Sequence, residues 1–512
     1  MVLARAHAFT IDLLQTRHVG VEVDVRAGLP AFTIVGLADA AVREARERIN
    51  AAIRNSGFEF PARRITANLA PGGFPKSGPG LDLALACAVL AASGQIPQAA
   101  LEQCALFGEL ALDGSVRPSR GTLAVAEATR RAGLPRLLLA GSRAHEAQMI
   151  GGLEVAVVER LSSAVRVLSG GAPDPLPRPR VSRGKGSSTP AKTLPAVDLG
   201  EVRGQPHAVR ALVIAAAGAH SCLLSGPPGV GKTMLAHRLP SILPPLTRSE
   251  AIAVAQLHSA AGESIEELCA ARPFRAPHHS ITAAGLIGGA RRGWVGEVAL
   301  AHNGVLFLDE LSEFARPTLE ALRQPLEDGR VAIVRGGHSA VHPTRFMLVA
   351  ATNPCPCGHG GEGERCSCSE AAIARYRRRL SGPLLDRIDL LATLHRGSDG
   401  ENTPALTSAQ ARNEVLAARE RQRRRLRGEG VAVNAQMDAR MLSEHVRLDA
   451  RGEEMLRRAH EWGLLSARGQ ARVLRVARTI ADLDGSSRVR ARDVGAALAL
   501  RPDVAVAEAP AA

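Results

Sequence analysis

A glycine-rich loop that contains a lysine constrains the fold of this chain more than any other segment. The loop reads Gly-Pro-Pro-Gly-Val-Gly-Lys-Thr. Such a loop connects a strand to a helix; its backbone N–H groups close around a phosphate, its lysine reaches the β- and γ-oxygens, and its hydroxyl contacts Mg²⁺. Lys232 is one of only four lysines in 512 residues, so a lysine remains where the planar arginine would not fit. We therefore expect the chain to bind a nucleoside triphosphate, ATP, together with Mg²⁺, through Gly226, Pro227, Pro228, Gly229, Val230, Gly231, Lys232 and Thr233.

The length and the charge of the chain narrow the remaining choices. A chain of 53.7 kDa is too long for one ordinary domain, and about two to four domains are expected. The formal net charge is +14, and residues 371–500 contain 25 arginines against 16 acidic residues. A basic surface favours nucleic acid or another polyanion as a partner. A GC-rich genome, whose codons favour arginine over lysine, would explain why the basic residues are arginines. It would not explain why basic residues outnumber acidic ones.

Changes in composition divide the chain into segments. Residues 171–193 are rich in proline, glycine and serine and have no apolar periodicity, which indicates a linker. A second break falls near residue 397, and helical periodicity then continues almost without interruption. The expected organisation is an α+β domain at 1–170, the linker, an α/β ATPase core at 194–396, an all-helical lid at 397–502 and a tail at 503–512.

Hydrophobic patterns predict several elements of the first domain. Alternation and short apolar runs predict strands at 19–25, 31–35 and 65–69. A helix is predicted at 39–55, because Asp39 can act as its N-cap and a glycine follows its end, and a buried helix is predicted at 81–90.

Two apolar strands of the core are each followed by polar side chains of the kind that ATP hydrolysis requires. The run Val-Leu-Phe-Leu precedes Asp309, which can hold Mg²⁺, and Glu310, which can polarise the attacking water. A second strand ends in Asn353, whose amide would orient that water beside the γ-phosphate. A buried strand that merely ends in acidic surface residues is the alternative, and the phosphate-binding loop upstream disfavours it.

Three arginines could stabilise the charge that develops during hydrolysis. Arg387 stands just ahead of a further apolar strand, where it can project across a subunit interface. The alternative is a structural arginine that pairs with Asp386 or Asp389. Arg468 and Arg472 open a helix of the predicted lid and could reach the nucleotide. The sequence does not distinguish between these two, and either could instead be solvated.

Three basic segments are candidates for contact with DNA. Residues 330–342 alternate around a Gly-Gly pair, which predicts a hairpin whose tip carries Arg335 and His338. These two side chains would bind phosphate in a central channel, although a structural hairpin without a ligand fits the spacing equally well. The arginine-rich stretches 375–379 and 419–427 could follow a nucleic-acid backbone or form solvated helix faces.

Four cysteines form two closely spaced pairs, Cys355 with Cys357 and Cys366 with Cys368, separated by a glycine-rich stretch that can bring the pairs together. Four thiolates suit a tetrahedral Zn²⁺ site; an iron–sulfur cluster and unliganded thiols are the other two interpretations. The remaining four cysteines are scattered and are expected in apolar cores.

The sequence predicts neither a signal peptide nor an apolar run long enough to span a bilayer. Eight cysteines in a long ATPase favour a reducing compartment, with metal binding ahead of disulfides. We therefore expect a cytoplasmic protein without membrane contact.

The order of the motifs resembles that of AAA+ ATPases, and further blocks narrow the resemblance. The chain is similar to the ComM/YifB family of magnesium-chelatase-like AAA+ ATPases over nearly its full length. The blocks that carry this resemblance include Arg-Pro-Phe-Arg-Ala-Pro-His-His-Ser at 272–280 and the stretches 286–289, 296–311, 319–330 and 476–483.

The resemblance implies a hexameric ring with ATP sites between subunits. ComM proteins are implicated in natural transformation, as DNA helicases that drive branch migration in homologous recombination. DNA junctions and recombination proteins are therefore the implied partners. The alternative is a chelatase-type motor that remodels a protein partner to insert Mg²⁺ into a porphyrin, and a third class is a scaffold that binds ATP without turnover. The net positive charge favours DNA as the partner. The presence of Asp309, Glu310 and Arg387, the residues needed for hydrolysis, argues against a scaffold.

The first domain resembles the proteolytic domain of Lon proteases, which has the ribosomal S5-type fold. The resemblance rests on the stretches 75–82 and 108–118. At the position of the nucleophilic serine this chain has Gly80, and near that of the catalytic lysine it has Leu123. Neither residue can attack a carbonyl or act as a base. The resemblance thus implies the fold without proteolysis, serving ring assembly or nucleic-acid contact.

Overall fold

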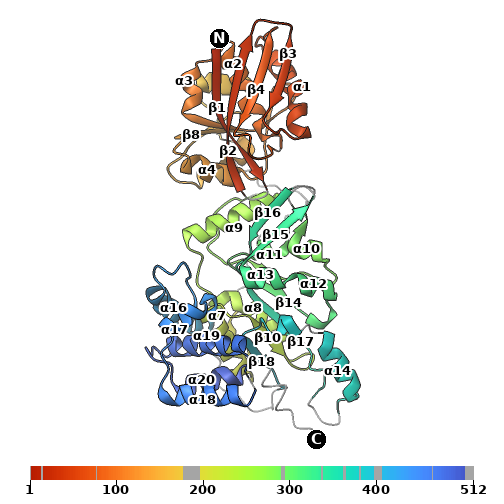
Figure 1. Cartoon of the computed structure of the whole chain (residues 1–512), viewed down its shortest axis with the longest axis vertical. Helices are drawn as coiled ribbons and strands as arrows, with labels where there is room; N and C mark the ends of the chain where they lie inside the picture. Colours follow the sequence, from red (N-terminus) through yellow and green to blue (C-terminus); the bar gives the residue numbers. More distant parts are fainter. Residues whose placement is uncertain are drawn as a thin grey trace.

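The computed structural model of this protein describes residues 2–12, 15–76, 78–176, 197–263, 265–289, 294–335, 338–360, 365–379, 382–396, 406–463 and 465–501. The molecule is elongated, with the first domain at one end and the core and the lid at the other (Figure 1). The first six residues of the predicted linker stay on the first domain, where the Asp174 N–H donates to the Val157 carbonyl at 2.9 Å. Residues 177–193, the break at 397 and the predicted tail lie outside the described residues.

The first domain is built on one seven-stranded sheet in the order β3-β4-β2-β1-β5-β8-β9. The β1–β2 and β2–β4 pairs are antiparallel and the other pairs are parallel. The strands are β1 (Val2–Asp12), β2 (Gln15–Arg26), β3 (Ala31–Val35), β4 (Arg64–Ala70), β5 (Cys104–Phe107), β8 (Arg136–Leu139) and β9 (Glu154–Val157), and a small hairpin joins β6 (Glu109–Leu110) to β7 (Val116–Arg117).

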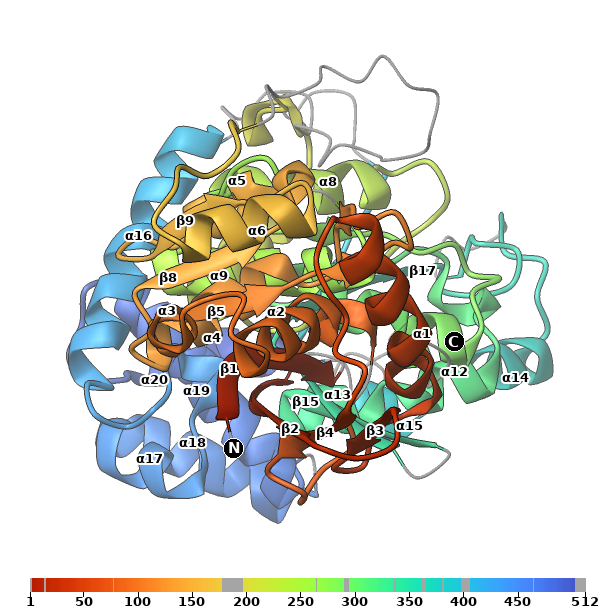
Figure 2. The same cartoon turned by 90° about the horizontal axis from the view of Figure 1, so that it is seen from above.

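Helices cover both faces of this sheet. One face is packed by α1 (Ala40–Asn55), α2 (Asp82–Ala92) and α6 (Leu161–Leu168), which Figure 2 shows from above. The other face carries α4 (Thr122–Arg131) and α5 (Ala144–Gln148), and α3 (Gln98–Glu102) lies beside β1. The predicted strands and helices are confirmed, and the Asp39 carboxylate caps α1 by accepting from the Val42 N–H at 2.8 Å. The S5-type assignment of this domain stays a prediction.

Strand β1 is among the elements of this domain that the sequence patterns did not predict. Its inward positions are alanines rather than large apolar residues, and Ala4, Ala6 and Ala8 are all buried. Small side chains suit this position because the fully buried helix α2 lies directly over β1 and β2.

The core is a five-stranded parallel sheet in the order β11-β14-β17-β10-β18. Every residue of β14 and β17 is buried, as expected where helices cover both faces of a parallel sheet. The predicted strands of this sheet are confirmed. Its strands are β10 (Cys222–Ser225), β11 (Phe274–Arg275), β14 (Val305–Leu308), β17 (Met347–Thr352) and β18 (Leu390–Thr393).

Helices and two hairpins surround the core sheet. The hairpins are β12 (Gly288–Gly289) with β13 (Trp294–Val295), and β15 (Arg330–Arg335) with β16 (His338–Pro343). The helices are α7 (Pro206–Gly218), α8 (Lys232–Ile242), α9 (Arg248–Ala261), α10 (Ala283–Ile287), α11 (Glu297–Leu300), α12 (Arg316–Ala321), α13 (Arg323–Asp328), α14 (Glu370–Arg379) and α15 (Gly382–Leu385).

The lid is helical, as expected, and a buried carboxylate ties it together. Its helices are α16 (Ser408–Arg425), α17 (Ala439–His445), α18 (Ala450–Glu461), α19 (Ala467–Leu483) and α20 (Ala491–Ala499). Asp482 in α19 accepts hydrogen bonds from the guanidinium of Arg425, from that of Arg478 and from the Asn434 amide. A buried carboxylate with three donors costs little to bury, because its lone pairs are satisfied.

Helix α9 joins the first domain to the core. Ala255 of this helix lies in the same apolar cluster as α4, α5 and the outer face of β5 and β8. Ser259, also on α9, donates to the buried Glu146 carboxylate of α5 at 2.8 Å. Figure 1 shows α9 directly beneath α4. Helix α9 therefore extends the helical layer of the first domain while it remains part of the ATPase core.

Among the described residues, no helix combines the length and the apolar character needed to cross a bilayer.

Candidate ATP site

The predicted ATP-binding and catalytic side chains meet at one edge of the core sheet. The glycine-rich loop follows β10, Asp309 and Glu310 follow β14, and Asn353 follows β17. These strands are parallel neighbours, so their carboxyl ends lie at the same edge. Gly231 begins α8 with a φ of +92°, a left-handed conformation that favours glycine. The loop is thus shaped as a phosphate-binding turn at a helix N-terminus.

Lys232 lies at the centre of this edge. Its ammonium donates to the carbonyls of Gly226 at 2.6 Å and Pro227 at 2.8 Å, and to Oδ1 of Asn353 at 2.9 Å. Burial lowers the pKa of Lys232, and the charge of Asp309 acts in the opposite direction. The lysine and the asparagine assigned to the γ-phosphate therefore contact each other directly.

Asp309 and Thr233 provide oxygen ligands for a hard cation. The Thr233 hydroxyl donates to Oδ2 of Asp309 at 2.7 Å, and the Glu310 N–H donates to the other oxygen at 3.0 Å. A hydroxyl and a carboxylate are the donor set that Mg²⁺ takes beside nucleotide phosphates. A cavity of about 180 Å³ opens beside them, lined by Lys232, Asp309, Glu310, Ser312, Glu313, Ala351, Thr352 and Asn353. The residues present therefore fit a magnesium ion.

Glu310 has an unusual backbone conformation and a histidine partner. Its φ is +52°, which residues other than glycine rarely adopt. Nδ1 of His279 lies 3.6 Å from Oε2 of Glu310. His279 lies in the segment 272–280, which carries the family resemblance, but the sequence alone indicates no role for it. The only sequence feature that could have drawn attention to His279 is the His-His pair, and this pair does not indicate that His279 lies beside Glu310.

Arg387 lies at the opposite edge of the sheet. It precedes β18, and the nearby Asp389 N–H donates to the carbonyl of Ser221, the residue just before β10. Four strand residues separate this amino edge from the carboxyl edge, a distance of about 13 Å. Arg387 is bonded to the carboxylate of Glu327 of α13.

The two lid arginines also lie at the amino edge. Nη1 of Arg468 is 3.9 Å from the same Glu327 carboxylate that Arg387 contacts. The pKa of Asp389 is lowered because, although burial raises it, His220 and lid arginines including Arg472 outweigh burial. The structure thus brings Arg468 to the Glu327 carboxylate that Arg387 contacts, and it brings Arg472 near Asp389, two residues after Arg387. Glu327, which gathers two of these arginines, was not recognised from the sequence.

The predicted DNA-binding hairpin is formed by β15 and β16. The strands pair from Arg330 opposite Pro343 to Arg335 opposite His338, which confirms the predicted register. The Gly-Gly turn and the side chains of Arg335 and His338 lie outside the described residues.

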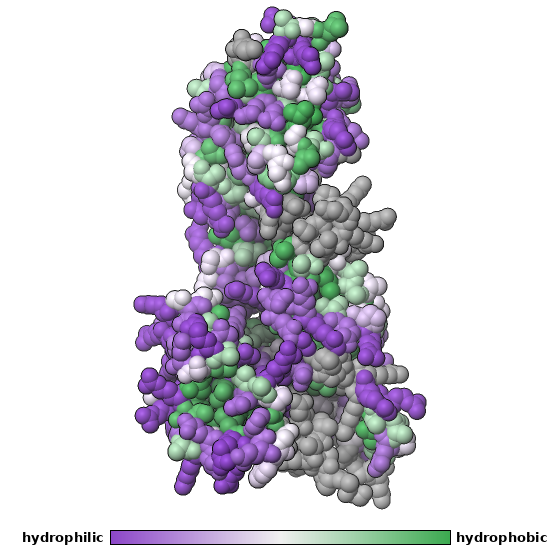
Figure 3. Space-filling view, in the orientation of Figure 1, coloured by the Kyte–Doolittle hydropathy of each residue, from purple (hydrophilic) through white to green (hydrophobic). Residues whose placement is uncertain are grey.

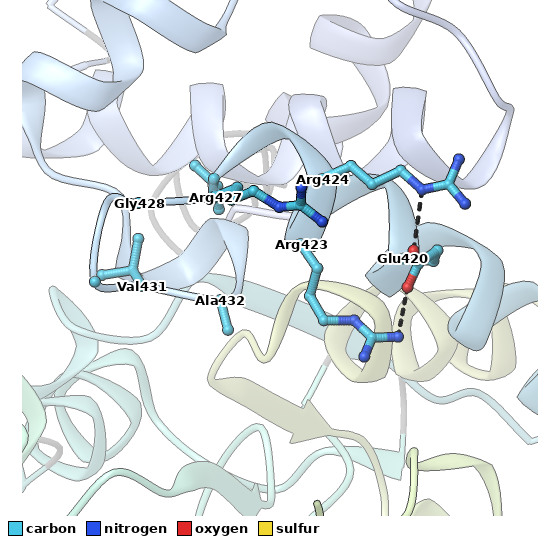
Figure 4. A pocket seen from close by; sticks show the side chains of 9 residues that line it. Glu420, Arg423, Arg424, Arg427, Gly428, Val431 and Ala432 are labelled. Atoms are coloured by element: carbon cyan, nitrogen blue, oxygen red, sulfur yellow. Dashed lines mark hydrogen bonds and ion pairs between the residues drawn. The ribbon is translucent and has the colours of Figure 1, made fainter.

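The arginine-rich stretch 419–427 divides into two sets. Arg419 donates to the Ala216 carbonyl, Arg421 to the Asp482 carbonyl and Arg425 to the Asp482 carboxylate, so these three arginines fasten α16 to its neighbours. Neither of the two readings of this stretch, contact with a nucleic-acid backbone or a solvated helix face, describes these three arginines. Figure 4 shows the second set around an open pocket of about 390 Å³, lined by Glu420, Arg423, Arg424, Leu426, Arg427, Gly428, Gly430, Val431 and Ala432. Glu420 pairs with two of these arginines.

The four clustered cysteines are brought together. The Sγ of Cys355 lies 3.3 Å from that of Cys357, and both lie 3.8 Å from that of Cys366. With Cys368 included, all four Sγ atoms lie within 4.8 Å of one another. A tetrahedral site with Zn–S bonds of about 2.3 Å has sulfur–sulfur edges of about 3.8 Å. The spacing of the sulfur atoms therefore fits a four-thiolate metal site. Separately, a hydrogen bond from the His359 backbone N–H lowers the pKa of the Cys357 thiol to about 6.

Three sequence models of magnesium-chelatase families match the chain. They are described as magnesium chelatase, subunit ChlI, at residues 198–402, subunit ChlI of Mg-chelatase at 21–142, and the ChlI C-terminal region at 405–501. An uncharacterized protein of Mycobacterium tuberculosis is 42% identical, over 98% of this chain and 99% of its own length. YifB of Escherichia coli is 40% identical over 94% and 93%, and the competence protein ComM of Haemophilus influenzae is 40% identical over 95% of both chains.

The chain belongs to the ComM/YifB family of magnesium-chelatase-like proteins. The predicted resemblance is thereby confirmed over the first domain, the core and the lid. For a ComM/YifB protein of this kind, the AAA+ core implies ATP, Mg²⁺ and ATPase activity.

In this ComM/YifB chain, the surroundings of Gly80 and Leu123, the two residues that the expected Lon resemblance singles out, are filled by other side chains. A Cβ at Gly80 would collide with the ring of Phe107, and Leu123 is fully buried in the apolar cluster beneath the sheet. At Gly80 there is thus no room for a larger side chain.

Replacing Gly80 by serine should destabilise the first domain by about 1–3 kcal/mol, because the added atoms overpack a filled site. Thermal unfolding of the full chain measures this change, and a peptidase assay should stay blank. Gly73→Ser is the matched control, since nothing lies within 4 Å of a Cβ at Gly73. Equal stability of the two variants, or peptidase activity in Gly80→Ser, would contradict our account of this domain.

Proposed function

We propose that this protein is an ATP-driven DNA motor that works as a hexameric ring in the cytoplasm. Its expected activity is branch migration as a helicase during homologous recombination in natural transformation. One observation carries the proposal: the two sets of ATP-site residues lie at opposite edges of the same sheet. A chain of this shape completes an ATP site only when a second copy presents its amino edge to the carboxyl edge of the first, which is a head-to-tail contact that closes into a ring.

Within each subunit, the carboxyl edge would bind and orient the nucleotide. Lys232 would exchange its contacts with Gly226, Pro227 and Asn353 for phosphate oxygens. Thr233 and Asp309 would hold Mg²⁺, which neutralises the phosphate charge when bound. Glu310, freed from His279, would accept a proton from the attacking water, and Asn353 would orient that water.

The neighbouring subunit would supply the positive charge. Arg387 and Arg468 share the Glu327 carboxylate, so one subunit presents them as a pair. Arg387 would exchange Glu327 for the γ-phosphate of the neighbour and stabilise the charge of the transition state. Arg468 and Arg472 of the same subunit would contact the same nucleotide. This arrangement gives the lid of one subunit a direct role in the ATP site of the next.

Several features support DNA as the substrate on which the motor acts. The net charge of +14 attracts a polyanion. Figure 3 shows hydrophilic residues over the upper part of the core and around an apolar patch on the lid. Arg423, Arg424 and Arg427 project around an open pocket that a phosphate backbone could enter (Figure 4). The β15–β16 hairpin, with Arg335 and His338 at its tip, would contact DNA in the channel of the ring. The name of the relative ComM, a competence protein, agrees with DNA uptake and recombination as the setting.

The alternative function is a chelatase-type motor that remodels a protein partner for Mg²⁺ insertion. The family models that match the core, the first domain and the lid carry the name of a magnesium-chelatase subunit, which favours this reading. The two functions share the ATP site and differ in what stimulates it.

We expect ATP hydrolysis by the purified protein to be stimulated by DNA, and more by a forked or three-stranded junction than by a plain duplex. DNA affinity should fall by about 10³-fold between roughly 50 and 200 mM salt, because phosphate contacts release counterions. The measurement is the hydrolysis rate with each DNA at several salt concentrations, with Lys232→Ala as the blank. Robust hydrolysis that ignores DNA at low salt would reject the DNA motor in favour of the chelatase-type alternative.

The same proposal includes a structural zinc ion held by the four clustered cysteines. The Sγ atoms of Cys355, Cys357 and Cys366 lie 3.3–3.8 Å apart, and all four Sγ atoms lie within 4.8 Å of one another, which fits a tetrahedral site. Elemental analysis of the purified protein separates the interpretations: zinc supports the assignment, whereas iron with visible absorption would replace it with an iron–sulfur cluster.

A further inference from the structure

The cysteine cluster follows the last lining residue of the nucleotide cavity, Asn353, directly in the chain. Cys355 comes only two residues after Asn353, the side chain that contacts the ammonium of Lys232 at 2.9 Å. Cys355 is fully buried. Any displacement of the first cysteine pair would therefore shift the asparagine that faces the phosphate site.

A second attachment is made by the turn between the cysteine pairs. Gly358 has a φ of +85°, and a Cβ added to it would lie 2.6 Å from Cδ of Pro228 in the glycine-rich loop. Its N–H donates to the Cys355 carbonyl at 3.0 Å, which closes the turn. Only glycine allows the backbone of this turn to lie directly on the phosphate-binding loop.

A third attachment follows the second cysteine pair. Tyr376 of α14 is the only tyrosine of the chain, and its hydroxyl lies 2.8 Å from the Ser312 hydroxyl. Both residues are buried. Ser312 lines the nucleotide cavity two residues after Glu310, so the helix after the cluster is fastened to the loop that carries the catalytic carboxylate.

The cluster segment has almost no apolar interior of its own. Among the described residues of 354–369, only Cys355 and Gly358 are buried. Ordering a glycine-rich segment costs about 1–2 kcal/mol per residue in backbone entropy, and little packing is present here to offset that cost. A bound metal ion supplies the missing interactions in segments of this kind.

We propose that the metal held by Cys355, Cys357, Cys366 and Cys368 controls the ATP site: metal occupancy sets the position of Asn353, of the phosphate-binding loop and of the loop after Glu310, and thereby the affinity for nucleotide. The inference rests on the proposed ATP-binding function and adds its regulation. The metal-loaded protein binds nucleotide tightly, and the metal-free protein binds it weakly.

The experiment compares nucleotide affinity with metal content in the full-length protein. A fluorescent ATP analogue is titrated into wild-type protein, into chelator-treated protein, and into chelator-treated protein after Zn²⁺ has been restored. We expect one zinc ion per chain in the wild type, an affinity about tenfold lower after chelation, and recovery on adding Zn²⁺; tenfold corresponds to the loss of one hydrogen bond to a charged group. Cys366→Ser should reproduce the chelated state, and Cys269→Ser, an exposed cysteine outside the cluster, should bind like the wild type.

The outcomes separate this inference from the proposed function. Wild-type protein that binds the analogue equally well with and without metal overturns the inference and leaves the ATP assignment in place. A protein that neither contains nor takes up metal also overturns it. Metal-loaded protein that binds no nucleotide would reject the ATP assignment itself. If Cys366→Ser fails to fold, chelation and restoration of the wild type, with circular dichroism to follow its fold, decide the question.

Discussion

Replacing Glu310 by glutamine is expected to reduce ATP hydrolysis by about 10²–10⁴-fold, the usual contribution of a general base. ATP binding should be kept, because Lys232, Thr233 and Asp309 are untouched. The amide cannot accept the proton of the attacking water, although it keeps the size of the carboxylate. The measurement is single-turnover hydrolysis together with nucleotide affinity and ring size, since trapped ATP should stabilise the assembled ring.

Glu313→Gln is the matched control for this experiment. Glu313 lines the same cavity three residues further along and is also exposed, but it has no place beside the attacking water in the proposed site. Its replacement should change the rate by less than about threefold, as for a surface substitution. Equal losses in the two variants, or unchanged hydrolysis in Glu310→Gln, would reject Glu310 as the base.

Replacing Arg387 by alanine should reduce hydrolysis by about 10³-fold or more, the effect of removing an arginine that stabilises the phosphoryl-transfer transition state. The sharper test is complementation. Arg387→Ala keeps its own phosphate-binding loop, whereas Lys232→Ala keeps its own Arg387. Mixed and reassembled at equal amounts, the two inactive variants should recover roughly a quarter of the sites, because each subunit meets its neighbour at random in a head-to-tail ring.

Recovery on mixing requires that the arginine act on the neighbouring subunit. Without recovery, Arg387 would act within its own chain or serve only to hold Glu327. Glu327→Gln distinguishes a structural role from a catalytic one: it breaks the same ion pair but leaves the guanidinium in place. Hydrolysis close to the wild type in Glu327→Gln, with a large loss in Arg387→Ala, would assign the effect to the arginine itself.

The local sequence predicted the core elements that carry the ATP-site residues. The strands that end before Asp309 and Asn353 are continuous apolar runs, because both faces of a parallel sheet are covered. The glycine-rich loop needs its glycines for backbone geometry alone, so the loop can be recognised in the sequence without knowledge of distant contacts. In the first domain the same approach missed β1, whose inward residues are alanines; their small size is explained only by the helix that lies on them.

The chain's own sequence determined the chemistry of the ATP site, because each reacting side chain is tied to the end of its strand by a short, recognisable motif. Only the tertiary structure decided which distant side chains meet. It placed Arg387 and Arg468 on Glu327 at the far edge of the sheet, and it brought His279 to Glu310. It also brought the cysteine segment onto Pro228 and Ser312. These contacts join residues far apart in the chain, and no periodicity or spacing within one segment specifies which distant segment packs against it.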